Sequence, residues 1–132
     1  MKVTRFDPAR DLIYVAVQIW GPRTDARLTF ALDTGSTETL VVPDVLDDVG
    51  YSARDGEQIT VIRSAIGDER GYMIRVERFA ALGFSAAGCR IHAHDLPDGY
   101  GIDGVLGLSF LRQFNYEIRS TEGRIVVDRA ES

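Results

Sequence analysis

The sequence contains little cysteine and no long hydrophobic run. Among its 132 residues Cys89 is the only cysteine, so an internal disulfide is impossible and a reducing compartment is expected. No apolar stretch is long enough to cross a bilayer, and the polar N-terminus has no signal-peptide core. These absences predict a cytoplasmic protein that does not use a membrane as a partner.

The charge pattern excludes another class of partner. The formal net charge is −5, and acidic and basic residues are scattered along the chain without a basic stripe. Nucleic acid is therefore not expected as a ligand. A chain of this length predicts one domain over residues 1–132. Its polar first ten residues, 1–10, are expected to form a loosely held arm.

Short apolar runs separated by turn residues predict an all-β fold. Alternating apolar residues over 12–20 and 26–32 predict two strands joined by a turn. Residues 43–50 begin with proline and end with glycine, which predicts a short connecting helix. A second helix is expected from Ser109, as its cap, to Phe114. Further extended runs are predicted at 57–65, 72–79, 81–84, 89–93, 115–119 and 124–128. Many short strands with frequent turns favour a closed barrel.

One acidic loop is the strongest candidate for chemistry. Asp33-Thr34-Gly35-Ser36 follows the strand ending at Leu32 and precedes a second apolar run, 40–42. Asp and Gly suit a tight loop because Asp accepts hydrogen bonds from nearby amides and Gly adopts strained backbone angles. A carboxylate held at the end of a core strand is a candidate for acid–base work.

The acidic loop and a downstream motif together resemble the retropepsin-like aspartic proteases. The downstream motif is Gly104-Val105-Leu106-Gly107, followed by a short predicted helix containing a leucine. The resemblance extends over about residues 12–127 and is nearer to the stand-alone bacterial members than to the retroviral ones. It implies a closed, six-stranded acid-protease barrel lobe with one or two short helices and no cofactor.

The resemblance also implies a homodimer. Hydrolysis of a peptide bond by this chemistry uses two carboxylates that share one proton, so their pKa values separate. The chain has one Asp-Thr-Gly and is too short for two lobes, so both Asp33 residues would meet at a twofold axis. Thr34 would lock the two loops together, Gly35 would bring the backbone close to the peptide, and Ser36 would donate a hydrogen bond to Asp33 and lower its pKa.

The same resemblance assigns a lid and pockets for a peptide or protein substrate. The hairpin over about 57–79, with a tip at 66–71, occupies the place of the flap; an ordinary exposed hairpin is the alternative. Ile66 and Gly67 at this tip, together with Val42 and Leu106, are candidates for substrate contact. Val105, Leu106 and Gly107 form the second motif.

The chain departs from retroviral members at two positions. Their loop carries an Asp two residues after its Gly, and their second motif carries an Arg after its Gly; here these positions hold Thr37 and Leu108. The bracing ion pair of the dimer is therefore missing. This departure keeps open a catalytically silent module used for dimerisation or peptide binding.

Two other groups of residues are weaker candidates for a functional site. Cys89, His92, His94 and Asp95 suggest a metal site, but Cys89 has the opposite strand parity to both histidines, so surface histidines and no metal are expected. Ser36, His92 and Asp103 could form a nucleophilic triad, but the chain has no Gly-x-Ser-x-Gly elbow. Asp103 could tune the acidic site, although a turn-forming role is favoured.

Overall fold

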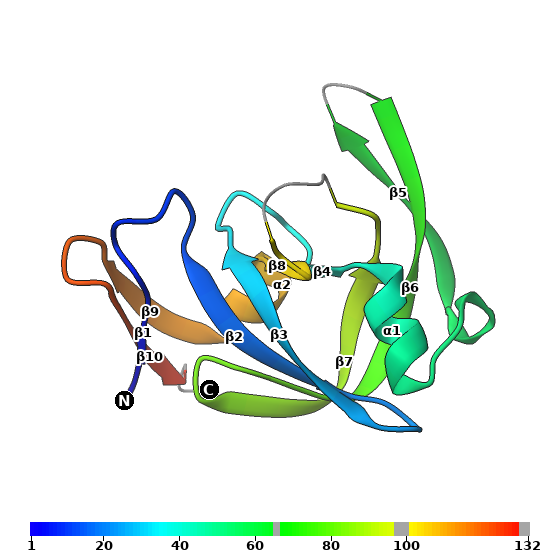
Figure 1. The fold of residues 1–132 in the computed structure, drawn as a ribbon, viewed down its shortest axis with the longest axis horizontal. Coiled ribbons are helices and arrows are strands. Elements are labelled where there is room, and N and C mark those ends of the chain that lie inside the picture. The colour runs from blue at the N-terminus through cyan, green and yellow to red at the C-terminus, as the bar shows by residue number, and fades with distance from the viewer. Residues whose placement is uncertain (65–66, 97–100, 130–132) are drawn as a thin grey trace.

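Six strands form a closed barrel in the computed structural model, which describes residues 1–64, 67–96 and 101–129. Each strand pairs with the next, and β2 also pairs with β6, which closes the ring (Figure 1). The predicted closed six-stranded barrel is therefore confirmed. In order around the ring, its strands are β2 (Tyr14–Trp20), β3 (Asp25–Leu32), β8 (Gly104–Leu106), β4 (Leu40–Val41), β7 (Phe84–Ala93) and β6 (Gly67–Ala81).

A second sheet of three strands contains both ends of the described chain. β1 (Lys2–Arg5) pairs with β10 (Arg124–Arg129), which pairs with β9 (Phe114–Arg119). The expectation of a loose arm is wrong for residues 2–5, because β1 is in antiparallel register with β10. The prediction relied on the polarity of these side chains. A strand is held by hydrogen bonds of its backbone, which form whether its exposed side chains are polar or apolar.

The hairpin of β5 (Gln58–Ser64) and β6 extends beyond the barrel (Figure 1). Ser64 pairs with Gly67, so only two residues connect the strands. The predicted tip at 66–71 is therefore wrong: β6 already begins at Gly67, and Ile66 lies outside the described residues. The hairpin and the loop after β3 project from the same end of the barrel (Figure 1).

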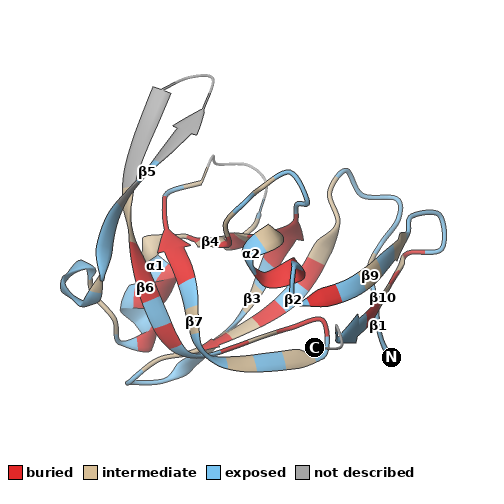
Figure 2. Cartoon of the chain, turned by 180° about the vertical axis from the view of Figure 1, so that it is seen from behind, coloured by how far each residue is buried: buried red, intermediate tan, exposed pale blue. Residues whose placement is uncertain are grey.

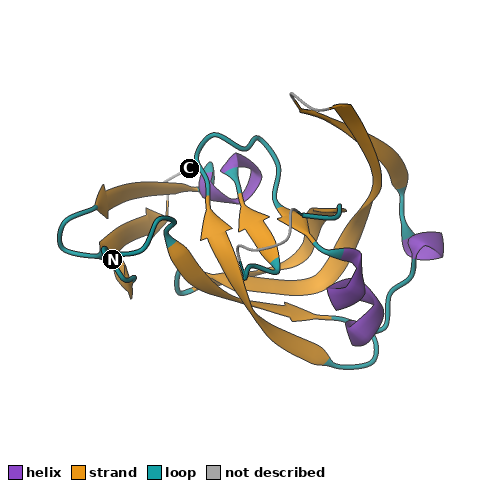
Figure 3. Cartoon of the chain, turned by 45° about the horizontal axis from the view of Figure 1, so that its top comes forward, coloured by secondary structure: helices purple, strands orange, loops and turns teal. Residues whose placement is uncertain are grey.

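Short helices lie outside the strands (Figure 3). α1 (Pro43–Val49) ends at Gly50, whose φ of 106° is the left-handed conformation that glycine adopts readily. A single 3₁₀ turn, η1, covers Ala53–Asp55. The second predicted helix is present as α2 (Leu108–Leu111), but its predicted bounds, Ser109 to Phe114, are wrong because it begins directly after Gly107 and Phe114 already belongs to β9.

The barrel interior follows the predicted alternation. Val15, Val17 and Ile19 of β2 are buried and alternate with more exposed neighbours, whereas β3 ends with three consecutive buried residues, 30–32 (Figure 2). The Phe30 ring packs edge-on against Phe79 of β6, with ring centroids 6.1 Å apart. Within the described residues, no helix is long and apolar enough to cross a membrane.

Candidate active site

Asp33 lies immediately after β3, at the point where this strand leaves the barrel. Its backbone N–H donates to the carbonyl of Leu106 at 2.9 Å, which continues the parallel pairing of β3 with β8. Its side chain is exposed, and Oδ1 accepts the N–H of Gly35 at 2.8 Å. A carboxylate fixed by a local amide yet open to solvent can exchange a proton with water or with a second carboxylate.

The second motif and the residues that follow it contact the backbone of the acidic loop. The N–H of Leu108 donates to the carbonyl of Ser36 at 2.8 Å, and that of Ser109 donates to Thr37 at 3.0 Å. A Cβ on Gly107 would collide with the carbonyl oxygens of Glu38 and Ser36, so only glycine allows this approach. The two motifs are therefore in direct contact, with Gly107 packed against the backbone of the acidic loop.

Thr39 and Ser109 add a partly buried polar contact that was not predicted from the sequence. Thr39 is 3% exposed, and its Oγ1 accepts hydrogen bonds from the Gly107 N–H at 3.2 Å and the Ser109 hydroxyl at 3.0 Å. The Thr39 N–H donates back to Ser109 Oγ at 3.0 Å. Ser109 was predicted to cap the helix, but its side chain makes no cap hydrogen bond. It instead joins α2 to the end of the acidic loop.

Ser36 does not donate to Asp33. Its hydroxyl donates to the carbonyl of Glu38 at 2.8 Å, while its N–H closes the turn on the Asp33 carbonyl at 3.2 Å. A hydroxyl has a single proton to donate, so the predicted bond to the Asp33 carboxylate is wrong in this conformation. Ser36 instead stiffens the loop that holds Asp33.

The two histidines are buried, so the prediction of surface histidines is wrong. His92 is 9% exposed and His94 2% exposed, with their rings stacked at 6.5 Å. Nε2 of His92 lies 3.1 Å from Oε2 of Glu38, and the His92 N–H donates to the Thr39 carbonyl at 3.0 Å. This pair ties the acidic loop to β7. No group of three or more metal-binding side chains occurs within the described residues.

The remaining candidates divide between core and surface. Asp103 accepts the Thr29 N–H at 2.9 Å through Oδ2, so its side chain makes a structural contact across 74 positions of sequence and not the local turn bond that was favoured for it. Leu106 is fully buried, so this structure gives its side chain no access to a ligand, whereas Val42 and Val105 are half-buried. Thr34 is exposed, as a contact across an axis would need, and Gly67 is placed here only as the first residue of β6.

Comparison with known proteins agrees with this geometry. Residues 15–110 match the family model described as aspartyl protease. A retropepsin-like aspartic protease from Rickettsia conorii superposes with a TM-score of 0.69 at 15% identity, covering 95% of this chain and 87% of that one. The EIAV protease complexed with the inhibitor HBY-793 gives a TM-score of 0.57 at 18% identity, covering 79% and 88%. No curated protein gives a match.

The fold and the paired motifs define a retropepsin-like lobe. The chain belongs to the aspartyl protease family, because the family model covers both the acidic loop and the second motif.

Proposed function

We propose that this protein is an aspartic endopeptidase of the retropepsin type that works as a homodimer. The observation that carries the proposal is the Asp33 carboxylate, exposed at the barrel end and rigidly held through Gly35, Leu106 and the contacts of Gly107. A single lobe supplies one acid of the two that the chemistry needs, so a second copy would supply the other.

In the proposed mechanism the two Asp33 carboxyls share one proton. The ionised one takes a proton from a water molecule as its oxygen attacks the peptide carbonyl, and the protonated one donates a hydrogen bond to the developing oxyanion. Proton transfer to the leaving nitrogen then completes cleavage. Because like charges this close do not both ionise readily, the pair titrates in two separate steps.

The β5–β6 hairpin is the proposed lid over an extended peptide. Ile59 and Val61 lie on one face of β5, where 76% and 51% of their surface is exposed. Apolar side chains left open on an edge strand are suited to covering a substrate or the partner's hairpin.

A mixing experiment tests both the chemistry and the dimer. We expect the purified protein to cleave a mixed peptide library, Asp33→Asn to abolish cleavage, and the exposed control Asp48→Asn to retain it. When wild type is equilibrated with a ninefold excess of Asp33→Asn, nearly every wild-type chain pairs with a silent one. Activity per wild-type chain should then fall about tenfold.

Two results would contradict the proposal. Unchanged activity per wild-type chain in the mixture would mean that a single chain carries the whole site. A stable dimer by analytical ultracentrifugation that cleaves nothing at any pH would favour the non-catalytic binding module instead.

A further inference from the structure

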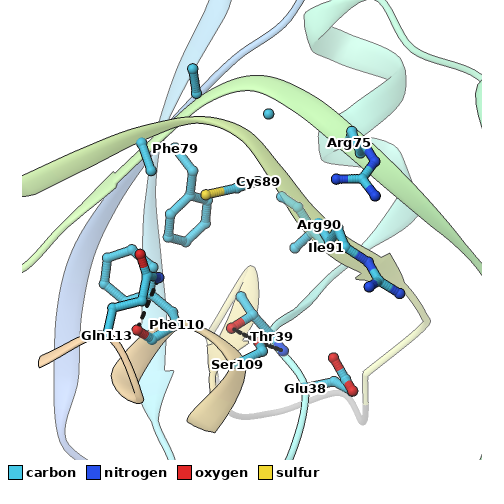
Figure 4. Close-up of a pocket in the computed structure, with 13 residues that line it drawn as sticks. Glu38, Thr39, Arg75, Phe79, Cys89, Arg90, Ile91, Ser109, Phe110 and Gln113 are labelled. Atoms are coloured by element: carbon cyan, nitrogen blue, oxygen red, sulfur yellow. Dashed lines mark hydrogen bonds between the residues drawn. The ribbon is translucent and has the colours of Figure 1, made fainter. Parts of the chain in front are cut away.

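Part of β7 has no strand paired with it on the side away from β6 in the described chain, although the ring of strands is closed through β4. β4 pairs with β7 only at His92 and Ala93, so residues 84–91 of β7 have β6 as their one strand neighbour in the described chain. Beside this edge lies a groove of about 440 Å³ (Figure 4). It is lined on one side by β7 from Ala86 to Ile91 and on the other by Ser109, Phe110 and Gln113, with the buried ring of Phe79 beneath.

The backbone of Arg90 faces this open edge. The His92 N–H donates to the Thr39 carbonyl, on the side of β7 away from β6. Peptide groups alternate in direction along a strand, so the N–H and C=O of Arg90 point the same way as those of His92. The residues that precede Thr39, however, belong to the acidic loop and do not continue the β4 strand along β7. The edge therefore offers a donor and an acceptor at Arg90 where the β4 ladder stops.

Two arginines lie directly opposite each other at this place. Arg75 of β6 is the register partner of Arg90, and by the same alternation they form a non-hydrogen-bonded pair, in which side chains are closest. Like charges in such a pair repel. Arg75 has an ion-pair partner, Glu57, at 3.1 Å, whereas Arg90 has none within the described residues. Figure 4 shows both guanidinium groups on the same side of the groove.

The other carboxylate at the groove does not neutralise this pair. Glu38 also lines the groove, but its carboxylate is bound to His92. A chain with a net charge of −5 thus presents an arginine, Arg90, that has no ion-pair partner within the described residues, next to a free sheet edge and a groove. An extended peptide that carries a carboxylate complements all three features.

We propose that the open edge of β7 at Arg90 binds an extended acidic peptide segment as an added strand. The peptide backbone bonds to the N–H and C=O of Arg90, one carboxylate lies against the Arg90 guanidinium, and an apolar side chain lies in the groove beside the half-buried Cys89. This groove is separate from Asp33 and does not depend on the proposed proteolysis.

Cys89 provides a direct readout, because it lines the groove and is the only cysteine of the chain. Burial raises the pKa of its thiol, so alkylation by the neutral reagent N-ethylmaleimide is best followed at mildly alkaline pH. The probes are capped peptides of about six residues, one alternating valine with glutamate and one alternating valine with glutamine. All measurements use Asp33→Asn, so that the result does not depend on cleavage.

We expect the glutamate peptide to slow alkylation of Cys89 and the glutamine peptide to protect at least about fivefold more weakly. Arg90→Gln should weaken protection by the glutamate peptide about three- to fivefold, whereas Arg27→Gln, an exposed arginine on β3, should leave it unchanged. Backbone N-methylation of the peptide should abolish protection, since an added strand needs its N–H groups.

Three outcomes would overturn the proposal. These are equal protection by both peptides, protection that survives Arg90→Gln, and amide chemical-shift changes confined to the Asp33 loop instead of Ala86–Arg90. Concentration-dependent association of the free protein that Arg90→Gln prevents would assign the edge to a second copy of the chain instead.

Discussion

The hydroxyl of Ser109 donates to the hydroxyl oxygen of Thr39 at 3.0 Å, across 70 positions of sequence. This contact joins the start of α2 to the end of the acidic loop, and the Gly107 N–H donates to the same oxygen. Because Thr39 is buried, its oxygen is the hydrogen-bond acceptor for both groups in place of water. The placement of Asp33 therefore depends on a residue with no part in the chemistry.

Replacing Thr39 with valine keeps the shape of the side chain but removes the acceptor. We expect Thr39→Val to lower the free energy of unfolding by about 1–3 kcal/mol, since the Gly107 N–H and the Ser109 hydroxyl lose their partner. Thr37→Val, at an exposed position two residues earlier, should change it by less than about 0.5 kcal/mol. Urea denaturation measures both, and equal effects would contradict a special role for Thr39.

The direction of the Ser36 hydroxyl predicts how the proposed activity responds to pH. Because this hydroxyl donates to the Glu38 carbonyl, Ser36→Ala should leave the acidic limb of the kcat/KM profile in place. It should lower stability by about 1 kcal/mol, through the lost bond in the loop. The pH profile with a peptide substrate is the measurement, and a displaced acidic limb would show that Ser36 donates to Asp33 in the working enzyme.

The exposed apolar side chains of β5 predict a binding effect without a folding effect. Ile59→Ser and Val61→Ser should each raise KM about three- to tenfold if the hairpin closes on a peptide, because each removes apolar surface that binding buries. Their unfolding free energies should change by less than about 0.5 kcal/mol. Val3→Ser, half-exposed on β1, is the matched control and should alter neither quantity; the same rise in KM there would point to a general effect.

Alkaline pH should destabilise the fold, because the folded state favours the neutral forms of Tyr72 and Cys89 and alkaline pH ionises both groups. Burial raises the pKa of Tyr72, and the Asp47 and Asp55 carboxylates raise it further; burial likewise raises the pKa of the Cys89 thiol. The unfolded chain ionises these groups at their ordinary values, so their contribution is complete below about pH 8 and is lost as pH rises through about 9–11. Urea midpoints across this range should fall, and the fall should be shallower in Tyr72→Phe. An equally steep fall in that variant would exclude Tyr72 as a cause.

Local patterns predicted the elements that local forces form. The alternation in β2 and β3, the proline and glycine that delimit α1, and the glycine-containing acidic loop depend on residues close together in sequence. The flap tip was misplaced because the charged residues that suggested a loop, 68–70, are part of β6. A strand that extends beyond the barrel can expose both faces, so polarity does not mark its end.

By itself the sequence determined a single acidic loop, one second motif and enough short strands for one barrel, because spacing along the chain sets these features. Tertiary structure decided that Thr39 supports the loop, that His92 pairs with Glu38, that Ser36 turns away from Asp33, and that residues 2–5 join β10. Each of these depends on which group offers the nearest acceptor once the chain has folded. Where the two partners are far apart in sequence, the residues between them do not show that the partners will lie close together in the folded chain.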